Sequence, residues 1–155
     1  MSTTLKVAGW REWIFLSDFD NTPVKAKVDT GARTSALHAF EVRTFVRDGQ
    51  LWVGFSLHPQ QKNTDQVLVC EAPVKDRRQV TDSGGHKEMR YVIEARLNLA
   101  GQTLVTEVTL TDRENMQFRM LLGRSALKNR YLVDSGQSFL LGGDRNQPPR
   151  LAVAG

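Results

Sequence analysis

The sequence contains a single cysteine, Cys70, in 155 residues. One cysteine excludes an internal disulfide framework, and the apolar run Val67-Leu68-Val69 before it indicates a buried thiol. No window approaches the roughly 18 apolar residues that a membrane-spanning helix needs, and residues 1–6 lack the apolar stretch of a leader peptide. We therefore expect a cytoplasmic protein that makes no membrane contact.

Charge of one sign is not concentrated anywhere in the chain. The net charge is +4, but the lysines and arginines are spread along the sequence, so no nucleic-acid-binding arm is expected. A hydrophobic content of 40% and a charged content of 25% are ordinary for a globular protein. The length suits one domain with a real core. We expect residues 1–155 to form that domain, with 142–155 as a loose tail.

Long amphipathic helices are also missing. Short alternating runs separated by turn signals recur instead, which is typical of an all-β sandwich or barrel. Asp48-Gly49, between the strand-like runs 42–47 and 50–57, predicts a two-residue hairpin. Further strands are expected at 7–10, 13–16, 23–28, 67–70, 91–99, 104–111 and 118–122.

Three expectations concern how these segments are arranged. Residues 33–39 are predicted to be a loop, and the strand at 91–99 is predicted to pair with the one that begins at Val67. Residues 131–133 and 138–141 are predicted to form a hairpin, because Asp134-Ser135-Gly136-Gln137 between them has the composition of a turn.

The most informative stretch is Asp29-Thr30-Gly31-Ala32. It follows a run in which Val24, Ala26 and Val28 alternate with two lysines, as in a half-buried strand. The glycine permits a tight turn at little steric cost, so the carboxylate of Asp29 can be held on a rigid element and pointed into a cleft. Taken alone, the same four residues also fit a polar turn that simply ends a strand.

A second motif lies later in the chain. The apolar run Met120-Leu121-Leu122 ends in Gly123-Arg124 and is followed by the helix-like residues 125–129. The order of Asp-Thr-Gly-Ala, a β-rich middle, apolar-apolar-Gly-Arg, a short helix and a final strand resembles the retropepsin-like aspartic peptidases. Residues 28–38 are similar to the bacterial branch often labelled "ATP-dependent zinc protease". That branch is commonly associated with ATP-grasp glutamate ligases of the ribosomal-protein-modifying kind.

The resemblance, which covers nearly the whole chain, implies both a fold and a chemistry. The fold would be all-β, a small closed barrel of the acid-protease type with one short helix. The chemistry would need two carboxylates that share a proton about a water molecule. One chain supplies a single Asp29, so a homodimer would supply the second. Thr30 would then cross-brace the two loops, and Gly31 would allow their close approach. Ala32 would belong to the same supporting loop, and Gly123 and Arg124 would be structural.

The sequence departs from the retroviral pattern in one place. Retroviral enzymes follow Asp-Thr-Gly-Ala with acidic residues, one of which pairs with the later Gly-Arg arginine. Here Arg33-Thr34-Ser35 stands in that position, so Arg124 must find another partner. Asp134-Ser135-Gly136 offers a second, internal half-site, but a hairpin turn explains it fully.

The polar arm at 74–90, with Ser83-Gly84-Gly85 at its tip, is the natural flap over a cleft. Its basic residues, with Arg33, could form one arc that clamps acidic or glutamate-tailed peptides. A solvated hairpin with ordinary surface charge is the alternative. The substrate-binding candidates are Arg33, Arg77, Arg78 and Arg90, with Lys75 and Lys87 in the same arc.

The sequence gives no reason to expect a metal or a nucleotide cofactor. His38, His58, His86 and Cys70 are far apart, and neither a His-Glu-x-x-His helix nor a phosphate-binding Gly-x-x-x-x-Gly-Lys motif occurs. Three functions stay open: an aspartic peptidase, a catalytically silent peptide-binding module that partners a glutamate ligase, and a zinc-dependent hydrolase. The sequence names neither the substrate nor the cleaved bond.

Overall fold

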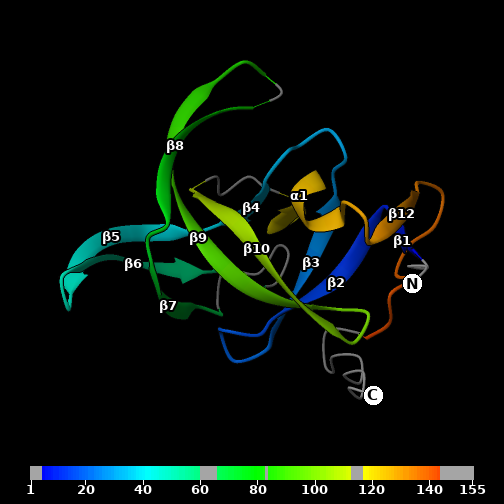
Figure 1. Cartoon of the computed structure of the whole chain (residues 1–155), viewed down its shortest axis with the longest axis horizontal. Coiled ribbons are helices and arrows are strands. Elements are labelled where there is room, and N and C mark those ends of the chain that lie inside the picture. The colour runs from blue at the N-terminus through cyan, green and yellow to red at the C-terminus, as the bar shows by residue number, and fades with distance from the viewer. Residues whose placement is uncertain (1–4, 60–65, 83, 113–116, 144–155) are drawn as a thin grey trace.

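A computed structural model describes residues 5–59, 66–82, 84–112 and 117–143. Figure 1 shows strands throughout and one short helix in this part of the chain, so the all-β class is confirmed. In chain order the elements are β1 (Lys6–Gly9), β2 (Arg11–Leu16), β3 (Thr22–Val28), β4 (Ser35–His38), β5 (Phe40–Arg47), β6 (Gln50–Leu57), β7 (Leu68–Pro73), β8 (Asp76–Thr81), β9 (Lys87–Leu99), β10 (Gln102–Thr111), β11 (Met120–Leu122), α1 (Arg124–Leu127) and β12 (Tyr131–Asp134).

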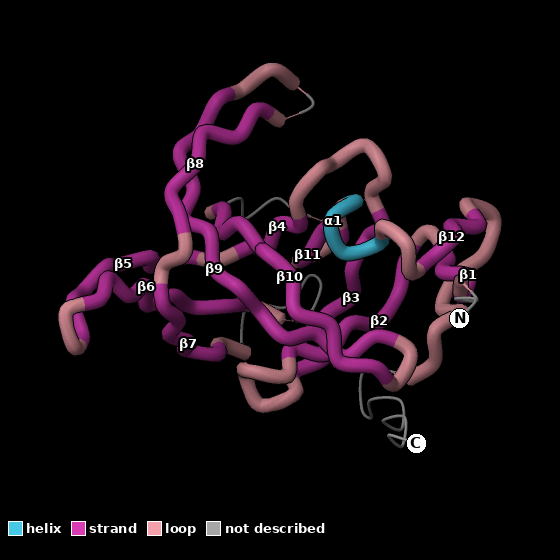
Figure 2. The backbone as a smooth tube through the Cα atoms, viewed as in Figure 1, coloured by secondary structure: helices cyan, strands magenta, loops and turns pink. Residues whose placement is uncertain are grey.

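The strands form three sheets. The largest has the order β10-β4-β11-β3-β2-β9-β8. Because β10 also pairs with β9, the six strands from β10 to β9 form a ring of pairings, and β8 lies outside this ring. A second sheet has the order β5-β6-β7, and β1 pairs with β12 in parallel. The hairpin made by β8 and the first part of β9 projects from the body, as Figure 2 shows.

The core follows from the alternation in the sequence. On β3, Val24, Ala26 and Val28 are buried, whereas Lys25 and Lys27 lie between them and are not. The largest fully buried side chains come from β2, β6, β9 and β11, including Phe15, Phe55 and Ile93. Burial of one such side chain contributes roughly 1.5–3 kcal/mol to stability, so the body that carries the site is held firmly from several strands.

Several local predictions are confirmed. Asp48 (φ 52°) and Gly49 (φ 75°) turn the chain between β5 and β6 in the left-handed region that such hairpins require. Cys70 is buried, and burial, followed by the charge of Asp20, raises the pKa of its thiol to about 12. In the described residues no helix has the length and apolar character needed to cross a membrane. Of the predicted tail, 144–155 lie outside the described residues.

Three predictions about arrangement are wrong. Residues 35–38 form the buried strand β4, because its backbone pairs with β10 and β11 on its two sides. β7 pairs with β6, and the strand at 87–99 pairs with β2, β8 and β10 instead. Residues 138–141 form no strand, since their backbone is held against β2 rather than against β12.

Candidate active site

The turn that carries Asp29 starts where β3 ends. The backbone N–H of Asp29 donates to the carbonyl of Leu122 at the end of β11 (2.9 Å). The side-chain Oδ1 of Asp29 accepts the N–H of Gly31 at 2.9 Å, and its carbonyl accepts the N–H of Ala32 at 3.2 Å. These bonds fix the carboxylate at the end of a paired strand.

The start of α1 braces this turn from the other side. The N–H of Arg124 donates to the carbonyl of Ala32 (2.8 Å), and the N–H of Ser125 donates to that of Arg33 (2.9 Å). Nη1 of the Arg124 side chain donates to the carbonyl of Thr30 at 3.0 Å. Arg124 thus has its partner within the same chain, on the backbone of the turn itself.

Gly123 is required by close packing at this junction. Its N–H donates to the buried hydroxyl of Ser35 at 3.0 Å. A Cβ at position 123 would lie 2.7 Å from the carbonyl carbon of Thr34 and 3.0 Å from the carbonyl oxygen of Ala32. Both contacts are with backbone atoms, and the carbonyl of Ala32 is already held by the N–H of Arg124, so the junction has no room for a side chain.

The turn opens on a cavity of about 900 Å³. Asp29, Gly31 and Ala32 line one side, and residues of β8, including Arg78, line the side formed by the hairpin. Its floor includes Ala36 of β4, Thr109 of β10 and Leu121 of β11. A cavity of this size matches the usual range for binding sites.

The cavity gathers some of the predicted binding residues and leaves others outside. Arg33, Arg78 and Arg90 line it. Arg77 does not line the cavity; its guanidinium lies 5.8 Å from the centre of the Tyr91 ring. Lys75 and Lys87 are also absent from the lining, so the six basic residues do not form one arc.

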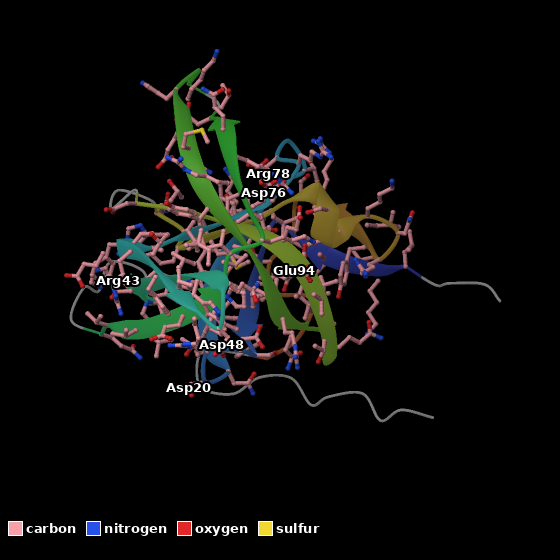
Figure 3. All side chains as sticks on the ribbon, turned by 60° about the vertical axis from the view of Figure 1, so that its left-hand side comes forward. Asp20, Arg43, Asp48, Asp76, Arg78 and Glu94 are labelled. Atoms are coloured by element: carbon pink, nitrogen blue, oxygen red, sulfur yellow. The ribbon has the colours of Figure 1, made fainter. Side chains whose placement is uncertain are left out.

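Each of the three guanidinium nitrogens of Arg78 donates to a neighbouring carboxylate. Its Nη1 and Nη2 donate to the two oxygens of Glu107 on β10 (2.8 and 3.0 Å), and its Nε donates to Asp76 at 2.6 Å. Figure 3 shows Arg78 and Asp76 together at the base of the hairpin. The hydrogen bonds that Arg78 donates to Glu107 and Asp76 raise the pKa of Arg78, and those that Glu107 accepts from Arg78 and Lys75 lower the pKa of Glu107 to about 2.

Lys75 adds a second link between the hairpin and the body. Its Nζ lies 2.9 Å from Glu94 and 3.2 Å from Glu107. Lys75 is half exposed, so this contact contributes little free energy by itself, but it shares Glu107 with Arg78. Together the two cations tie the base of the flap to β10.

Glu107 lines the cavity and was not among the predicted site residues. The signal was available, because Glu107, Thr109 and Thr111 are alternate residues of one strand and so share a face. The sequence does not show that this face of the strand points toward the Asp29 turn. A carboxyl group with a pKa near 2 stays ionised, so Glu107 is unsuited to share a proton with Asp29.

The histidines need one correction. The rings of His38 and His58 are not far apart: their centroids are 6.2 Å apart, and the ring of Phe40 stacks on His58 at 4.2 Å. His86 is separate, at the hairpin tip beside Asp82; Ser83 lies outside the described residues. Within 5–59, 66–82, 84–112 and 117–143, no three histidine, cysteine, aspartate or glutamate side chains are grouped to hold a metal.

Asp134 lies outside the site. It ends β12, which pairs with β1, and it does not line the cavity. In Figure 1, β1 and β12 lie on the side of the molecule away from the β8–β9 hairpin. Asp134 therefore does not supply Asp29 with a second carboxylate.

The fold and site together define a class: an all-β protein in which a strand-end Asp-Thr-Gly turn, braced by a Gly-Arg helix start, faces a cavity. A family described as "Retropepsin-like aspartic endopeptidase RimB" matches residues 7–142. The chain belongs to this RimB-like family.

Relatives extend this comparison. The chain is 45% identical over 142 residues to a protein of Shewanella pealeana named "Probable alpha-L-glutamate ligase", covering 92% of this chain and 31% of the relative. A protein of the same name from Desulfotalea psychrophila is 40% identical over 137 residues, covering 88% of this chain and 30% of the relative. The chain thus spans about a third of the length of these relatives.

A solved structure supports the fold. A Legionella pneumophila protein of unknown function superimposes with a TM-score of 0.77 and 23% identity, covering 90% of this chain and 100% of that one. At this level of identity the likeness concerns the fold alone.

Proposed function

We propose that the protein is an aspartic peptidase whose catalytic pair consists of Asp29 from each of two copies. The observation that carries the proposal is the fixed position of Asp29: it is bonded to the end of β11, turned by its own bond to Gly31, and placed on the wall of a cavity of about 900 Å³. The return of the strand pairings to β10 supports the closed barrel of such enzymes.

The chemistry follows from two carboxylates held close together, of which one is protonated. The ionised carboxylate takes a proton from a water molecule as the water oxygen bonds to the scissile carbonyl carbon, and the protonated carboxyl gives its proton to the carbonyl oxygen. The C–N bond then breaks as its nitrogen takes a proton from the pair, and one hydroxyl of the tetrahedral diol returns a proton to the pair. The products are a carboxylic acid and an amine, and the pair is again singly protonated. Thr30 and Gly31 are exposed in the single chain, so they are accessible to the second copy.

Glutamate-bearing peptides are the substrates that the comparisons favour. Relatives at 40–45% identity are named as glutamate ligases, and a peptidase that removes glutamate would oppose such an activity. The alternative, a catalytically silent peptide-binding module that partners a ligase, has support from the same names, since the matching part is about a third of those chains. A measured turnover separates the two.

The deciding experiment compares Asp29→Asn with Asp134→Asn. Both changes keep the side-chain shape and both lie in an Asp-X-Gly turn, but only the first removes the proposed base. Since general acid–base catalysis contributes about 10²–10⁴-fold, peptide hydrolysis should fall by at least about 100-fold in Asp29→Asn and stay unchanged in Asp134→Asn. Undiminished hydrolysis in Asp29→Asn, with the fold checked by circular dichroism, would refute the mechanism.

Dimerisation has its own test. If each copy supplies half of the pair, activity per chain should fall as the protein is diluted below the dissociation constant of the dimer. Sedimentation at the same concentrations gives the fraction of dimer. Constant activity per chain in a sample shown to be monomeric would rule out the shared pair.

A further inference from the structure

Arg90 is a buried cation on the cavity wall. Its side chain is 7% exposed, yet it lines the same cavity as Asp29. Nε donates to Glu88 at 2.9 Å, and Nη1 makes a long bond to the hydroxyl of Thr109 at 3.4 Å. Within the described residues, Nη2 has no hydrogen-bond partner. Because a guanidinium carries five N–H donors, Arg90 keeps donor capacity that the chain does not use.

The other arginines near the cavity do not combine burial with free donors. Arg78 is 38% exposed, and its charge is already balanced by the carboxylates of Glu107 and Asp76, to which its three nitrogens donate. Arg33 lines the cavity but is exposed to solvent, where a single ion pair contributes little. Arg77 lies outside the cavity.

The charge of Arg90 is also incompletely balanced. Among the described residues its acidic partner is Glu88, which is 40% exposed and also accepts a bond from the hydroxyl of Thr111 at 3.0 Å. A buried cation gains most from a partner that is desolvated with it, and a guanidinium binds carboxylates through paired, charge-assisted hydrogen bonds.

We propose that Arg90 binds a carboxylate of the substrate and is the residue by which the cavity selects acidic peptides. The carboxylate is either the side chain of a glutamate or aspartate or the free C-terminus of the peptide. The inference rests on the proposed function, because it assigns the substrate preference of that same cavity to one residue.

The topology places this subsite away from the cleaved bond. From Asp29, just after β3, to Arg90 on β9 the floor passes β11, β4 and β10, with Leu121, Ala36 and Thr109 in the lining. Neighbouring strands are about 4.8 Å apart, so the two residues are separated by several strand spacings along the floor. The carboxylate bound by Arg90 should therefore belong to a residue other than the two joined by the scissile bond.

The test uses one set of fluorescently labelled peptides with a single glutamate moved along the chain, each paired with its glutamine counterpart, and each made as a free acid and as a C-terminal amide. Binding is measured with Asp29→Asn protein, so that hydrolysis does not interfere. Turnover is measured with the wild type. Arg90→Gln and Arg90→Lys are compared with Arg77→Gln, which removes the same charge outside the cavity.

At one peptide position, glutamate should bind about tenfold or more tightly than glutamine, as expected for a charge-assisted hydrogen bond. Arg90→Gln should reduce that ratio to near one, Arg90→Lys should keep part of it, and Arg77→Gln should leave it unchanged. If the preference follows the C-terminus instead, the free acid and the amide will differ in the same way.

Two results would overturn the inference. One is equal binding of glutamate and glutamine peptides at every position, and of free acids and amides, which needs no Arg90 variant. The other is a preference that persists in a folded Arg90→Gln protein. Arg90-dependent binding without turnover would refute the peptidase and leave the carboxylate subsite. Turnover at equal rates for all peptides would refute the carboxylate subsite and leave the peptidase.

Discussion

The chain contains two turns with almost the same sequence, Asp29-Thr30-Gly31 and Asp134-Ser135-Gly136, and they fold in the same way locally. In each, the aspartate Oδ1 accepts the N–H of the glycine, at 2.9 Å in the first and 3.0 Å in the second. In each, the aspartate carbonyl accepts the N–H three residues on, at 3.2 and 3.3 Å.

Their surroundings differ. The first turn is joined to β11 and to the start of α1 by four hydrogen bonds that come from Asp29, Arg124 and Ser125, and it faces the cavity. The second follows a strand of the two-stranded sheet and lies outside the cavity. The comparison teaches that the local motif makes a turn, whereas the bracing and the cavity make a candidate active site.

The largest effect is expected from adding a methyl group at the brace. In Gly123→Ala the new Cβ would meet the backbone of Thr34 at 2.7 Å, so the free energy of unfolding should fall by about 1–3 kcal/mol and hydrolysis should fall with it. Gly136→Ala is the control, because its Cβ would meet nothing closer than 3.5 Å. Equal effects in urea unfolding would show that the two turns are constrained alike.

The next effect comes from the side chain that reaches the turn. Arg124→Met removes the bond to the carbonyl of Thr30 and should cost about 1 kcal/mol, while the displaced loop lowers kcat about tenfold or more. The exposed Arg130→Met, just before β12, should change neither quantity. An unchanged kcat in Arg124→Met would mean that the turn does not depend on this contact.

Removing the two carboxylates tests what the turns share. Asp29→Ala and Asp134→Ala each lose one bond to a backbone N–H at an accessible site, so each should lower the free energy of unfolding by a similar amount, about 0.5–1 kcal/mol. Only the first should abolish hydrolysis. A much larger stability loss in one variant would contradict the local equivalence of the turns.

The last effect depends on pH and concerns the cavity wall, which is absent at the Asp134 turn. Bonds from Arg78 and Lys75 lower the pKa of Glu107 from 4.5 to about 2 in the folded protein. Its contribution to stability is therefore complete above pH 4.5 and is lost as the pH falls toward 2. The stability difference between wild type and Glu107→Gln, from urea unfolding at pH 2–6, should shrink over that range. A difference that does not depend on pH would exclude this ion pair as its cause.

Much of this could be read from the chain because short-range rules apply to it. Alternation located β3, the Asp48-Gly49 pair located the β5–β6 turn, and the glycine of Asp-Thr-Gly predicted the turn that holds Asp29.

Other features depend on contacts between segments far apart in the sequence. The sequence by itself determined the all-β class and the turn at Asp29. Only the tertiary structure decided that Arg124 reaches Thr30, that Glu107 neutralises Arg78, and that Arg90 is buried with unused donors. The reason is physical: a turn is fixed by the backbone preferences of its own residues, whereas burial and pairing are fixed by which strands become neighbours.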